Sequence, residues 1–396
     1  MIILGTPGIG KTYFGYFLLL YLARFKSTVV YETVLMRKVY VFTPDRVFIF
    51  KENSHDVDNY LKDPETFYIV DGQRPDYVNA KTILLSSFRK EIWYKFSNEG
   101  ADIRHMPVWS RKEILNCRSL LYPELSEDLV KDLYSRWGGI ARYVLKLATN
   151  TEKQEDLTKA IGESNIYSIL QSIGGSGKKA EASSRLIHSL VTEDFHSGPY
   201  VFASEYVATK IYEHAYKNAR EKLIRFISAS DRMDPYGQLR GTMFENFAHT
   251  VLARGGSFKV RDLQTNEEST LELPGDLKFF KYSSNDDIQA ARNHYFIPAS
   301  KTFKSVDSFI KPNLLFQMTC AENHPCKQAG LRDVLNNILD HPSEPKLYFV
   351  VPPDRFATFT YQSYHGTNGQ VLSEPGIFRC VRELSQFVLE LPLVSQ

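Results

Sequence analysis

The chain has 396 residues, of which 43% are hydrophobic and 24% are charged, and its formal net charge at pH 7 is +2. This length predicts two or three domains, and the composition is typical of a globular protein. The small net charge excludes DNA binding through bulk charge, so a nucleic-acid contact would require a local basic face. The four cysteines are scattered without a CxxC pair, which argues against a zinc site and a disulfide framework.

An apolar run at 13–23 resembles a membrane or signal segment only at first sight. The run is shorter than the roughly 20 residues that a spanning helix needs, and no basic region precedes it. We therefore expect neither a membrane contact nor a targeting segment in this chain.

The first residues combine an expected strand at 1–4, a glycine-rich turn and an expected helix at 13–24. The segment GTPGIGKT fits the pattern G-x-x-x-x-G-K-[ST]. Glycines allow backbone N–H groups to surround phosphates, and the helix N-terminus adds a positive dipole end. The lysine reaches the β- and γ-phosphates, and the threonine hydroxyl binds Mg²⁺. The pattern predicts an ATP site with Mg²⁺ that is formed by Gly5, Gly8, Gly10, Lys11 and Thr12.

A second strand supplies the acid that such a loop needs for its magnesium ion. The segment TFYIVDG ends in Asp71, which we interpret as the Walker B acid, a second ligand of the Mg²⁺. The alternative is a turn residue that merely follows a strand. A neighbouring carboxylate would orient the attacking water, but Gly72 stands at that position. The sequence therefore favours nucleotide binding over fast hydrolysis.

Three later segments extend this domain. AKTILLSSFRKE predicts a buried strand that ends in Ser86 and Ser87, and MPVWSRKEIL predicts a helix with Ser110 as N-cap and Glu113 three residues later. In RWGGIARYVL, a glycine pair precedes a helix that has Arg142 near its start. The Arg142 side chain either reaches the phosphates or caps the helix in solvent, and the composition leaves both readings open.

The order of these motifs resembles the NTPase module of Crinkler effectors. A similar module occurs in trypanosomatid retrotransposon hot spot proteins, and both relate to STAND-type ATPases. The last motif of the family commonly reads Gly-Gly-x-Pro-Arg; here Ala141 stands in the place of the proline, and Arg142 keeps the arginine. The resemblance implies that Arg142 contacts the nucleotide, and it resumes beyond residue 236.

Residues 151–235 show no strand alternation and are predicted to form a helical lid region over the NTPase domain. Within this region, 205–228 has apolar residues at every fourth position, which predicts one amphipathic helix. Lys210, His214 and Lys217 share another face of that helix. The basic face is either a solvated surface or a DNA contact.

Residues 236–396 follow the order helix, strands, helix, strand, which is the layout of a restriction-endonuclease-like core. Such a core needs acids that converge on a Mg²⁺ ion, which activates water beside a phosphodiester. Asp307 and Gln317 are expected on neighbouring strands joined through Lys311-Pro312, and Glu245 is expected from the preceding helix. The segments SVDSFI, NLLFQMT and KLYFVVPP resemble the C-terminal nuclease-like module of Crinklers.

This candidate nuclease site departs from the superfamily pattern at two positions. Gln317 replaces an acid, and Thr319 replaces the usual lysine, whose role His324 or Lys327 could take. An amide is a weaker ligand than a carboxylate for a hard cation, so we expect weak binding, with Mn²⁺ favoured over Mg²⁺. The predicted cation ligands are Glu245 and Asp307, and the predicted catalytic residues are Glu245, Asp307, Gln317 and Lys327.

Together these features predict an α/β fold in three parts: a P-loop NTPase domain at 1–150, the helical lid region at 151–235, and a restriction-endonuclease-like α/β domain at 236–396. The expected function is an ATPase coupled to metal-dependent binding and cleavage of double-stranded DNA. The alternatives are a nucleotide-regulated DNA-binding effector with an inactive nuclease fold and an ATPase regulator that acts on proteins. The resemblance implies secretion by a eukaryotic microbe and action in a host nucleus. A host nuclear protein is a candidate partner, and the oligomeric state is left open.

Overall fold

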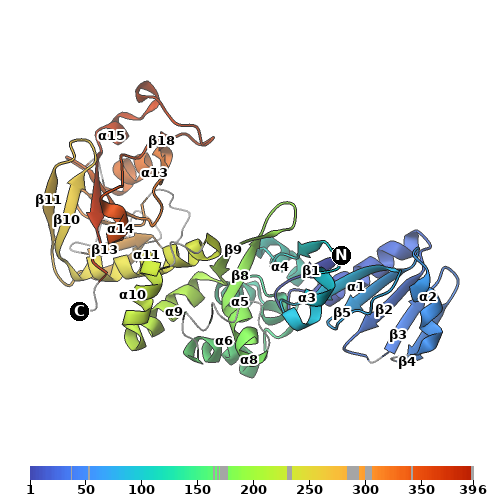
Figure 1. Ribbon diagram of the computed structural model, residues 1–396. Helices are drawn as coiled ribbons and strands as arrows, with labels where there is room; N and C mark the ends of the chain where they lie inside the picture. Colours follow the sequence, from blue (N-terminus) through green and yellow to red (C-terminus); the bar gives the residue numbers. More distant parts are fainter. Residues whose placement is uncertain are drawn as a thin grey trace. The chain divides into compact units, whose positions relative to one another are not determined.

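The computed structural model describes residues 1–36, 38–51, 54–163, 166, 169, 177–229, 234–282, 294–298, 306–339 and 342–393. The chain forms two compact units, Met1–Ala219 and Arg220–Gln396 (Figure 1). Each unit combines a sheet with helices, so the predicted α/β class is confirmed. Residues 151–219 are part of the first unit, and the predicted division into three parts stays a prediction.

A seven-stranded sheet in the order β4-β3-β2-β5-β6-β1-β7 is the centre of the first unit. Its parallel strands are β2 (Val29–Thr33), β5 (Phe67–Asp71), β6 (Lys81–Ser86), β1 (Ile2–Leu4) and β7 (Ile103–His105). An antiparallel hairpin is added by β3 (Lys38–Phe42) and β4 (Val47–Lys51). The register pairs Leu4 with Ser86 and Asp71 with Leu85. The loops after β1, β5 and β6 therefore open at one edge, where ligands of parallel sheets bind.

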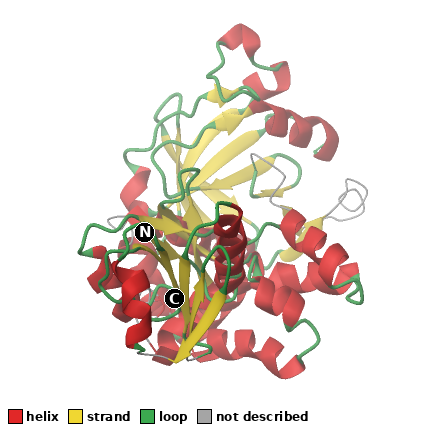
Figure 2. Ribbon diagram, turned by 90° about the vertical axis from the view of Figure 1, so that its right-hand side faces the viewer, coloured by secondary structure: helices red, strands yellow, loops and turns green. Residues whose placement is uncertain are grey.

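Helices cover both faces of this sheet (Figure 2) because alternate strand residues point to opposite faces. On one face, Ile3 and Ile69 pack with apolar residues of α1 (Lys11–Arg24). On the other face, Ile2 and Val70 pack with α2 (Asp58–Lys62), the short helix η1 (His55–Val57) and α3 (Lys90–Ser97). The helix expected at 13–24 begins two residues earlier, so Lys11 and Thr12 lie in its first turn.

The rest of the first unit is mainly helical. Its elements are α4 (Arg111–Leu121), α5 (Glu127–Trp137), η2 (Arg142–Lys146), α6 (Thr151–Glu163), α8 (Gly177–Leu186), β8 (Ile187–Val191), β9 (Ser197–Phe202) and α9 (Glu205–Asn218). The predicted start of α4 is confirmed as a capping box: Glu113 N donates to Ser110 Oγ (3.3 Å), and Ser110 N donates to Glu113 Oε2 (2.7 Å).

The helical reading of 151–235 is wrong at two places. Strands β8 and β9 form an antiparallel hairpin, and His105 N at the end of β7 donates to Phe195 O in its turn (2.7 Å). The expected single helix at 205–228 is interrupted at Ala219, between α9 and α10 (Arg220–Ala229). On α9, Lys210 pairs with Glu213 (2.7 Å), so an acid interrupts the basic face.

The second unit contains an eight-stranded mixed sheet in the order β11-β10-β19-β17-β15-β14-β13-β12. The strands are β10 (Gly256–Asp262), β11 (Glu268–Leu273), β12 (Lys278–Tyr282), β13 (His294–Pro298), β14 (Ser308–Ile310), β15 (Leu314–Met318), β17 (Lys346–Val351) and β19 (Ser385–Glu390). A small separate pair is formed by β16 (Cys326–Lys327) and β18 (Tyr364–His365). The sequence pattern did not indicate β12, β13 or β19.

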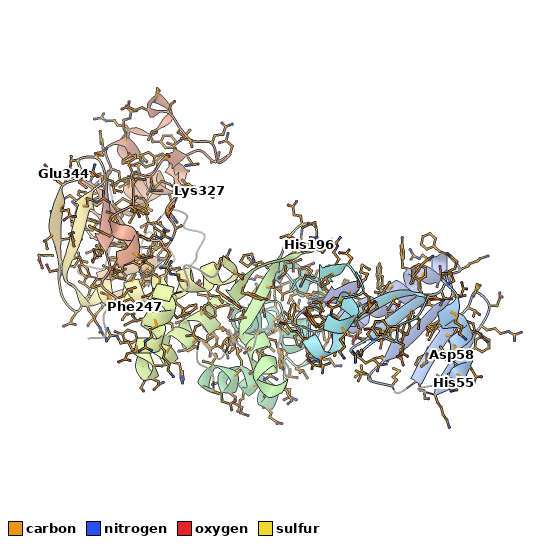
Figure 3. All side chains as sticks on the ribbon, in the orientation of Figure 1. His55, Asp58, His196, Phe247, Lys327 and Glu344 are labelled. Atoms are coloured by element: carbon orange, nitrogen blue, oxygen red, sulfur yellow. The ribbon has the colours of Figure 1, made fainter. Side chains whose placement is uncertain are left out.

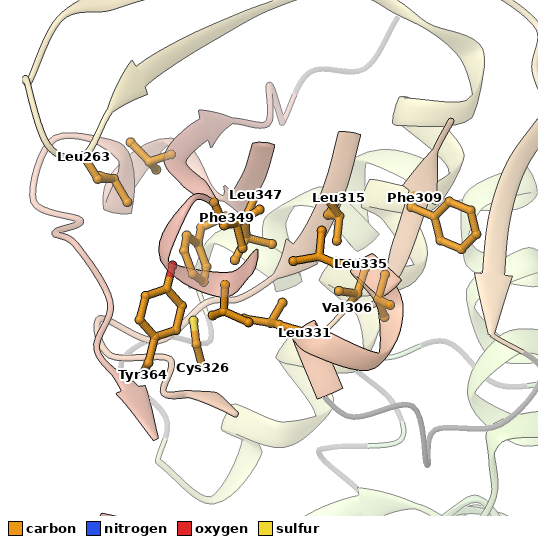
Figure 4. Close-up of a cluster of buried hydrophobic side chains, with 14 of the residues drawn as sticks. Leu263, Val306, Phe309, Leu315, Cys326, Leu331, Leu335, Leu347, Phe349 and Tyr364 are labelled. Carbon is orange, nitrogen blue, oxygen red and sulfur yellow. The ribbon is translucent and has the colours of Figure 1, made fainter. Parts of the chain in front are cut away.

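The described helices of this unit are α10, η4 (Asp234–Tyr236), α11 (Gly237–Arg254), α13 (Gln328–Asp333) with its continuation η5 (Val334–Ile338), α14 (Pro353–Phe356), η6 (Glu374–Gly376) and α15 (Arg379–Arg382). In the main core, Leu315, Leu347 and Phe349 of the sheet meet Leu331 and Leu335 (Figure 4). The predicted long helix after residue 236 and the predicted neighbouring strands on either side of Lys311-Pro312 are confirmed, and the two strands, β14 and β15, pair antiparallel. Among the described helices, none has the length and apolar character that a membrane crossing requires.

Candidate functional site

The glycine-rich loop between β1 and α1 borders a pocket of about 520 Å³ in the first unit. Loop residues 7–10, the start of α1, the ends of β5 and β6 and the start of η2 all contribute to its lining. The structure thus brings together most of the predicted nucleotide ligands, namely Gly8, Gly10, Lys11, Thr12, Asp71 and Arg142. Gly5 is not among the lining residues. A Cβ there would lie 2.8 Å from Ile9 Cδ1, so the lack of a side chain at this position leaves room for Ile9.

Two loop glycines adopt backbone conformations that other residues rarely adopt. Gly8 has φ +89°, and Gly10, the N-cap of α1, has φ +106°. A Cβ at Gly8 would also lie 3.0 Å from Arg142 Cβ. The motif glycines are therefore needed both for the path of the loop and for the close approach of the segment that carries Arg142.

Lys11 lies at the centre of the charged groups of this pocket. Its Nζ donates to Gly5 O (2.8 Å) and Thr6 O (2.9 Å). Desolvation lowers the pKa of Lys11 to about 7; the Asp71 carboxylate opposes this shift, while the Arg142 and Arg89 guanidinium groups add to it. An amine that is desolvated beside two guanidinium groups favours the arrival of an anion, because a negative charge would stabilise all three cations.

Asp71 provides the acid of the same pocket. Burial raises the pKa of Asp71, whereas a hydrogen bond with the Thr12 side chain and the charge of Lys11 lower it. The Thr12 hydroxyl and the Asp71 carboxylate therefore lie side by side, and both offer the oxygen ligands that Mg²⁺ prefers. These two residues fit a magnesium site next to a bound phosphate.

The loop is held from behind by two motifs that are distant in the sequence. Trp109 Nε1 donates to Ile9 O (2.6 Å), and Arg142 N donates to Gly8 O (3.0 Å). The two motifs also contact each other, because Trp109 N donates to Gly139 O (3.0 Å). The MPVWS and RWGGIARYVL segments thus stabilise the loop by donating to its backbone carbonyl groups, from the Trp109 indole and from Arg142 N, a role that their sequence did not indicate.

Arg89 is a pocket residue that sequence reasoning missed. It lines the pocket, and one of its guanidinium nitrogens donates to Gly72 O (3.3 Å). Arg89 follows the end of β6 by three residues, close to Ser86 and Ser87, and this position in the sequence could have indicated that it lines the pocket. The contact of Arg142 with the nucleotide stays a prediction.

The acidic residues of the second unit form a separate candidate site. Asp307 Oδ2 accepts hydrogen bonds from Gln317 Nε2 (2.7 Å) and Met318 N (2.7 Å). Gln317 is 7% exposed, and its Oε1 is buried without a hydrogen-bond partner among the described residues. The structure therefore brings Asp307 and Gln317 into contact, as expected, although Asp307 lies one residue before β14 rather than on the strand.

Glu245 lies on α11 between the fully buried Phe244 and Phe247, the latter labelled in Figure 3. Burial, followed by the charges of Asp307 and Glu245, raises the pKa of Tyr295, while a hydrogen bond with Ser308 lowers it. Both carboxylates therefore lie near Tyr295. The Tyr295 hydroxyl hydrogen-bonds with Ser308 Oγ (2.6 Å) and His249 Nδ1 (3.0 Å). These three buried side chains form a polar network.

This acidic site offers two carboxylates and one amide. In the part of the chain that the structure describes, no group of three or more His, Cys, Asp and Glu side chains is arranged to hold a metal ion. Lys327 is exposed at β16 (Figure 3). The catalytic roles of Glu245, Asp307, Gln317 and Lys327 stay predictions, as does metal binding by Glu245 and Asp307.

Comparison with known proteins agrees with the family that the motifs indicated. No protein-family model matches the chain. Crinkler effector proteins 16 and 15 of Phytophthora infestans are each 24% identical to it over 91% of its length. The chain spans about 60% of the length of these curated relatives. The resemblance to Crinkler effectors is confirmed.

Proposed function

We propose that this relative of Crinkler effectors is itself an effector whose first unit binds ATP with Mg²⁺ and hydrolyses it slowly. The observation that carries the proposal is the meeting of Lys11, Thr12 and Asp71 in one pocket against a loop with left-handed glycines. The loop N–H groups and the N-terminus of α1 supply donors for phosphate oxygens. Lys11 would exchange its two carbonyl partners for the phosphates and regain its full charge.

Thr12 and Asp71 would hold the magnesium ion, which supplies charge neutralisation on the phosphates when it is bound. Slow hydrolysis follows from Gly72. This residue has φ +80°, and a Cβ there would lie 3.1 Å from Val34 Cγ1. A carboxylate at position 72 would require both a strained backbone and a shift of Val34, so the position cannot easily supply a group that orients water.

For the second unit we propose a restriction-endonuclease-like module that binds and cleaves double-stranded DNA with a weakly held divalent cation. The contact between Asp307 and Gln317, with Glu245 near the same tyrosine, supports this proposal. The same contact favours a second candidate, a nucleotide-regulated DNA-binding effector with an inactive nuclease fold. Asp307 Oδ2 already accepts two hydrogen bonds, which leaves fewer lone pairs of this carboxylate for a cation.

The cellular role rests on the relatives, which are named effector proteins. We propose that the protein is secreted by a eukaryotic microbe and acts in a host nucleus, where double-stranded DNA and a host nuclear protein are the expected partners.

One experiment separates these functions. The purified chain is incubated with supercoiled plasmid at two salt concentrations, with and without ATP and with Mg²⁺, Mn²⁺ or EDTA, while phosphate release is followed. Metal-dependent nicking supports the nuclease. Salt-sensitive DNA binding without nicking supports the DNA-binding effector. Phosphate release without any DNA binding would leave an ATPase that acts on proteins, and the absence of ATP binding would overturn the first proposal.

A further inference from the structure

The nucleotide pocket contains a group of side chains that the phosphate chemistry does not use. Tyr13 comes from the first turn of α1, and Cys117, Leu121 and Tyr122 come from the end of α4. These four residues line the same pocket as Lys11. We call them the apolar shelf.

The members of the apolar shelf adjoin one another in space. Burial, followed by the Tyr13 and Cys117 side chains and by Glu124, which does not line the pocket, raises the pKa of the Tyr122 hydroxyl. Tyr13 follows Thr12 directly, so the shelf begins where the phosphate cradle ends. A nucleotide with its phosphates in the loop would therefore extend its base past the first turn of α1, toward Tyr122.

The shelf also exposes apolar surface. Tyr13 is 67% exposed and Leu121 is 70% exposed, although both line a pocket. Covering such surface with a planar, weakly polar group is favourable because apolar area leaves water. A purine base provides such a group, and phenol rings stack on its faces.

We propose that Tyr13 and Tyr122, backed by Cys117 and Leu121, bind the base of a nucleoside triphosphate by stacking and accept adenine and guanine alike. This inference rests on the proposed nucleotide site. The shelf side chains offer two phenol hydroxyls and a thiol, with no carboxylate or amide to read the edge of a base. Strong discrimination requires hydrogen-bonding groups that read the edge of the base and are left unpaired by the wrong ligand, and the shelf provides neither a carboxylate nor an amide for this.

The test compares the binding of ATP, GTP and inorganic tripolyphosphate by calorimetry, each with Mg²⁺, to the full chain. The variants are Tyr122→Ala, Tyr122→Phe and, as a matched control, Tyr77→Ala; Tyr77 is 59% exposed and does not line the pocket. We expect ATP and GTP affinities within about threefold of each other. Loss of the ring in Tyr122→Ala should weaken both nucleotides about tenfold and leave tripolyphosphate binding unchanged. Tyr122→Phe and Tyr77→Ala should match the wild type.

Each outcome has a distinct meaning. Equal weakening of all three ligands by Tyr122→Ala, or a preference for one purine above about 100-fold, would overturn the shelf while the phosphate site stands. Equal affinity of the wild type for ATP and tripolyphosphate would do the same. Binding of none of the three ligands would overturn the nucleotide site itself.

A second measurement does not depend on a variant that folds. Alkylation of Cys117, followed by mass spectrometry, should be slowed by ATP and by GTP but not by tripolyphosphate, because only a bound base covers the thiol. Protection by tripolyphosphate to the same extent would contradict the proposal.

Discussion

The two candidate sites of this protein differ in how the chain constructs them. In the first unit, the proposed phosphate cradle is a contiguous segment, and residues 7–12 all line the pocket. In the second unit, Glu245 lies on a helix, Gln317 on a strand and Asp307 just before another strand; Asp307 contacts Gln317, and the charges of Glu245 and Asp307 both act on buried Tyr295. A loop motif specifies backbone geometry and chemistry together, whereas a scattered set depends on the packing of the whole unit.

The charges of the two sites differ as well. The first pocket gathers Lys11, Arg89 and Arg142 around one acid, Asp71, and this balance favours an anion. The second site has two acids, one of which is engaged by an amide and a backbone N–H. The charges of the first pocket therefore suit an anion, whereas a cation at the second site would have to compete with the hydrogen bonds of Asp307.

The largest effect is expected from a substitution that disables the first site alone. Lys11→Ala should weaken ATP binding at least about 100-fold, since it removes a desolvated charge that pairs with phosphate. Hydrolysis, measured by phosphate release, should be lost with it, while the melting temperature stays near that of the wild type. Lys112→Ala, at an exposed position of α4, is the control. Unchanged hydrolysis in Lys11→Ala would contradict the proposed cradle.

A change in the second site should leave the first site intact. Asp307→Ala should abolish plasmid nicking, and because two donors lose their acceptor it should also reduce the free energy of unfolding by roughly 1–3 kcal/mol. ATP hydrolysis should stay unchanged, because the two sites belong to separate units. Asp307→Asn, which keeps an acceptor oxygen, separates lost chemistry from lost stability. A parallel loss of ATP hydrolysis in both variants would show that the sites are coupled.

A third change tests whether the first site depends on the MPVWS and RWGGIARYVL segments, which donate hydrogen bonds to its loop. A Cβ at Gly139 would lie 2.1 Å from Trp109 O, so Gly139→Ala must displace Trp109, whose indole Nε1 donates to Ile9 O. We expect a loss of about 1–3 kcal/mol in the stability of the first unit, together with weaker ATP binding.

The matched control for that change is Gly162→Ala, because a Cβ at this helical glycine meets nothing within 4 Å. Its stability should rise by about 0.5–1 kcal/mol. Chemical denaturation of both variants measures the difference. Equal stabilities for the two variants would refute the role assigned to Gly139.

The smallest effect concerns the pH dependence of stability. The pKa of Lys11 is about 7 in the fold, below its ordinary value of 10.5, so the unfolded chain binds more protons between these values. The free energy of unfolding should therefore rise with pH above 7 by at most about 1.4 kcal/mol per pH unit, and partial solvent access of Lys11 reduces this amount. Denaturation at pH 7 and pH 8 should show the rise in the wild type but not in Lys11→Met. A slope shared by both chains would assign it to other groups.

Local patterns in the sequence determined much of the first unit. The strand, glycine turn and helix of the opening segment follow from residue types at fixed spacing, as does the capping box of Ser110 and Glu113. The same holds for the β14–β15 pair and the long helix α11 in the second unit. These features depend on interactions between residues close in the chain, which a single sequence displays directly.

Only the tertiary structure decided the features that depend on distant partners. The β8–β9 hairpin, whose turn bonds to His105, has no clear alternation of its own. Contacts across the fold likewise produce the break at Ala219 and the apolar shelf at the end of α4. They also produce the hydrogen bonds that Trp109 and Arg142 donate to the carbonyl groups of the loop. Such contacts are selected by packing and by the pairing of buried polar groups, and neither leaves a fixed spacing in the sequence.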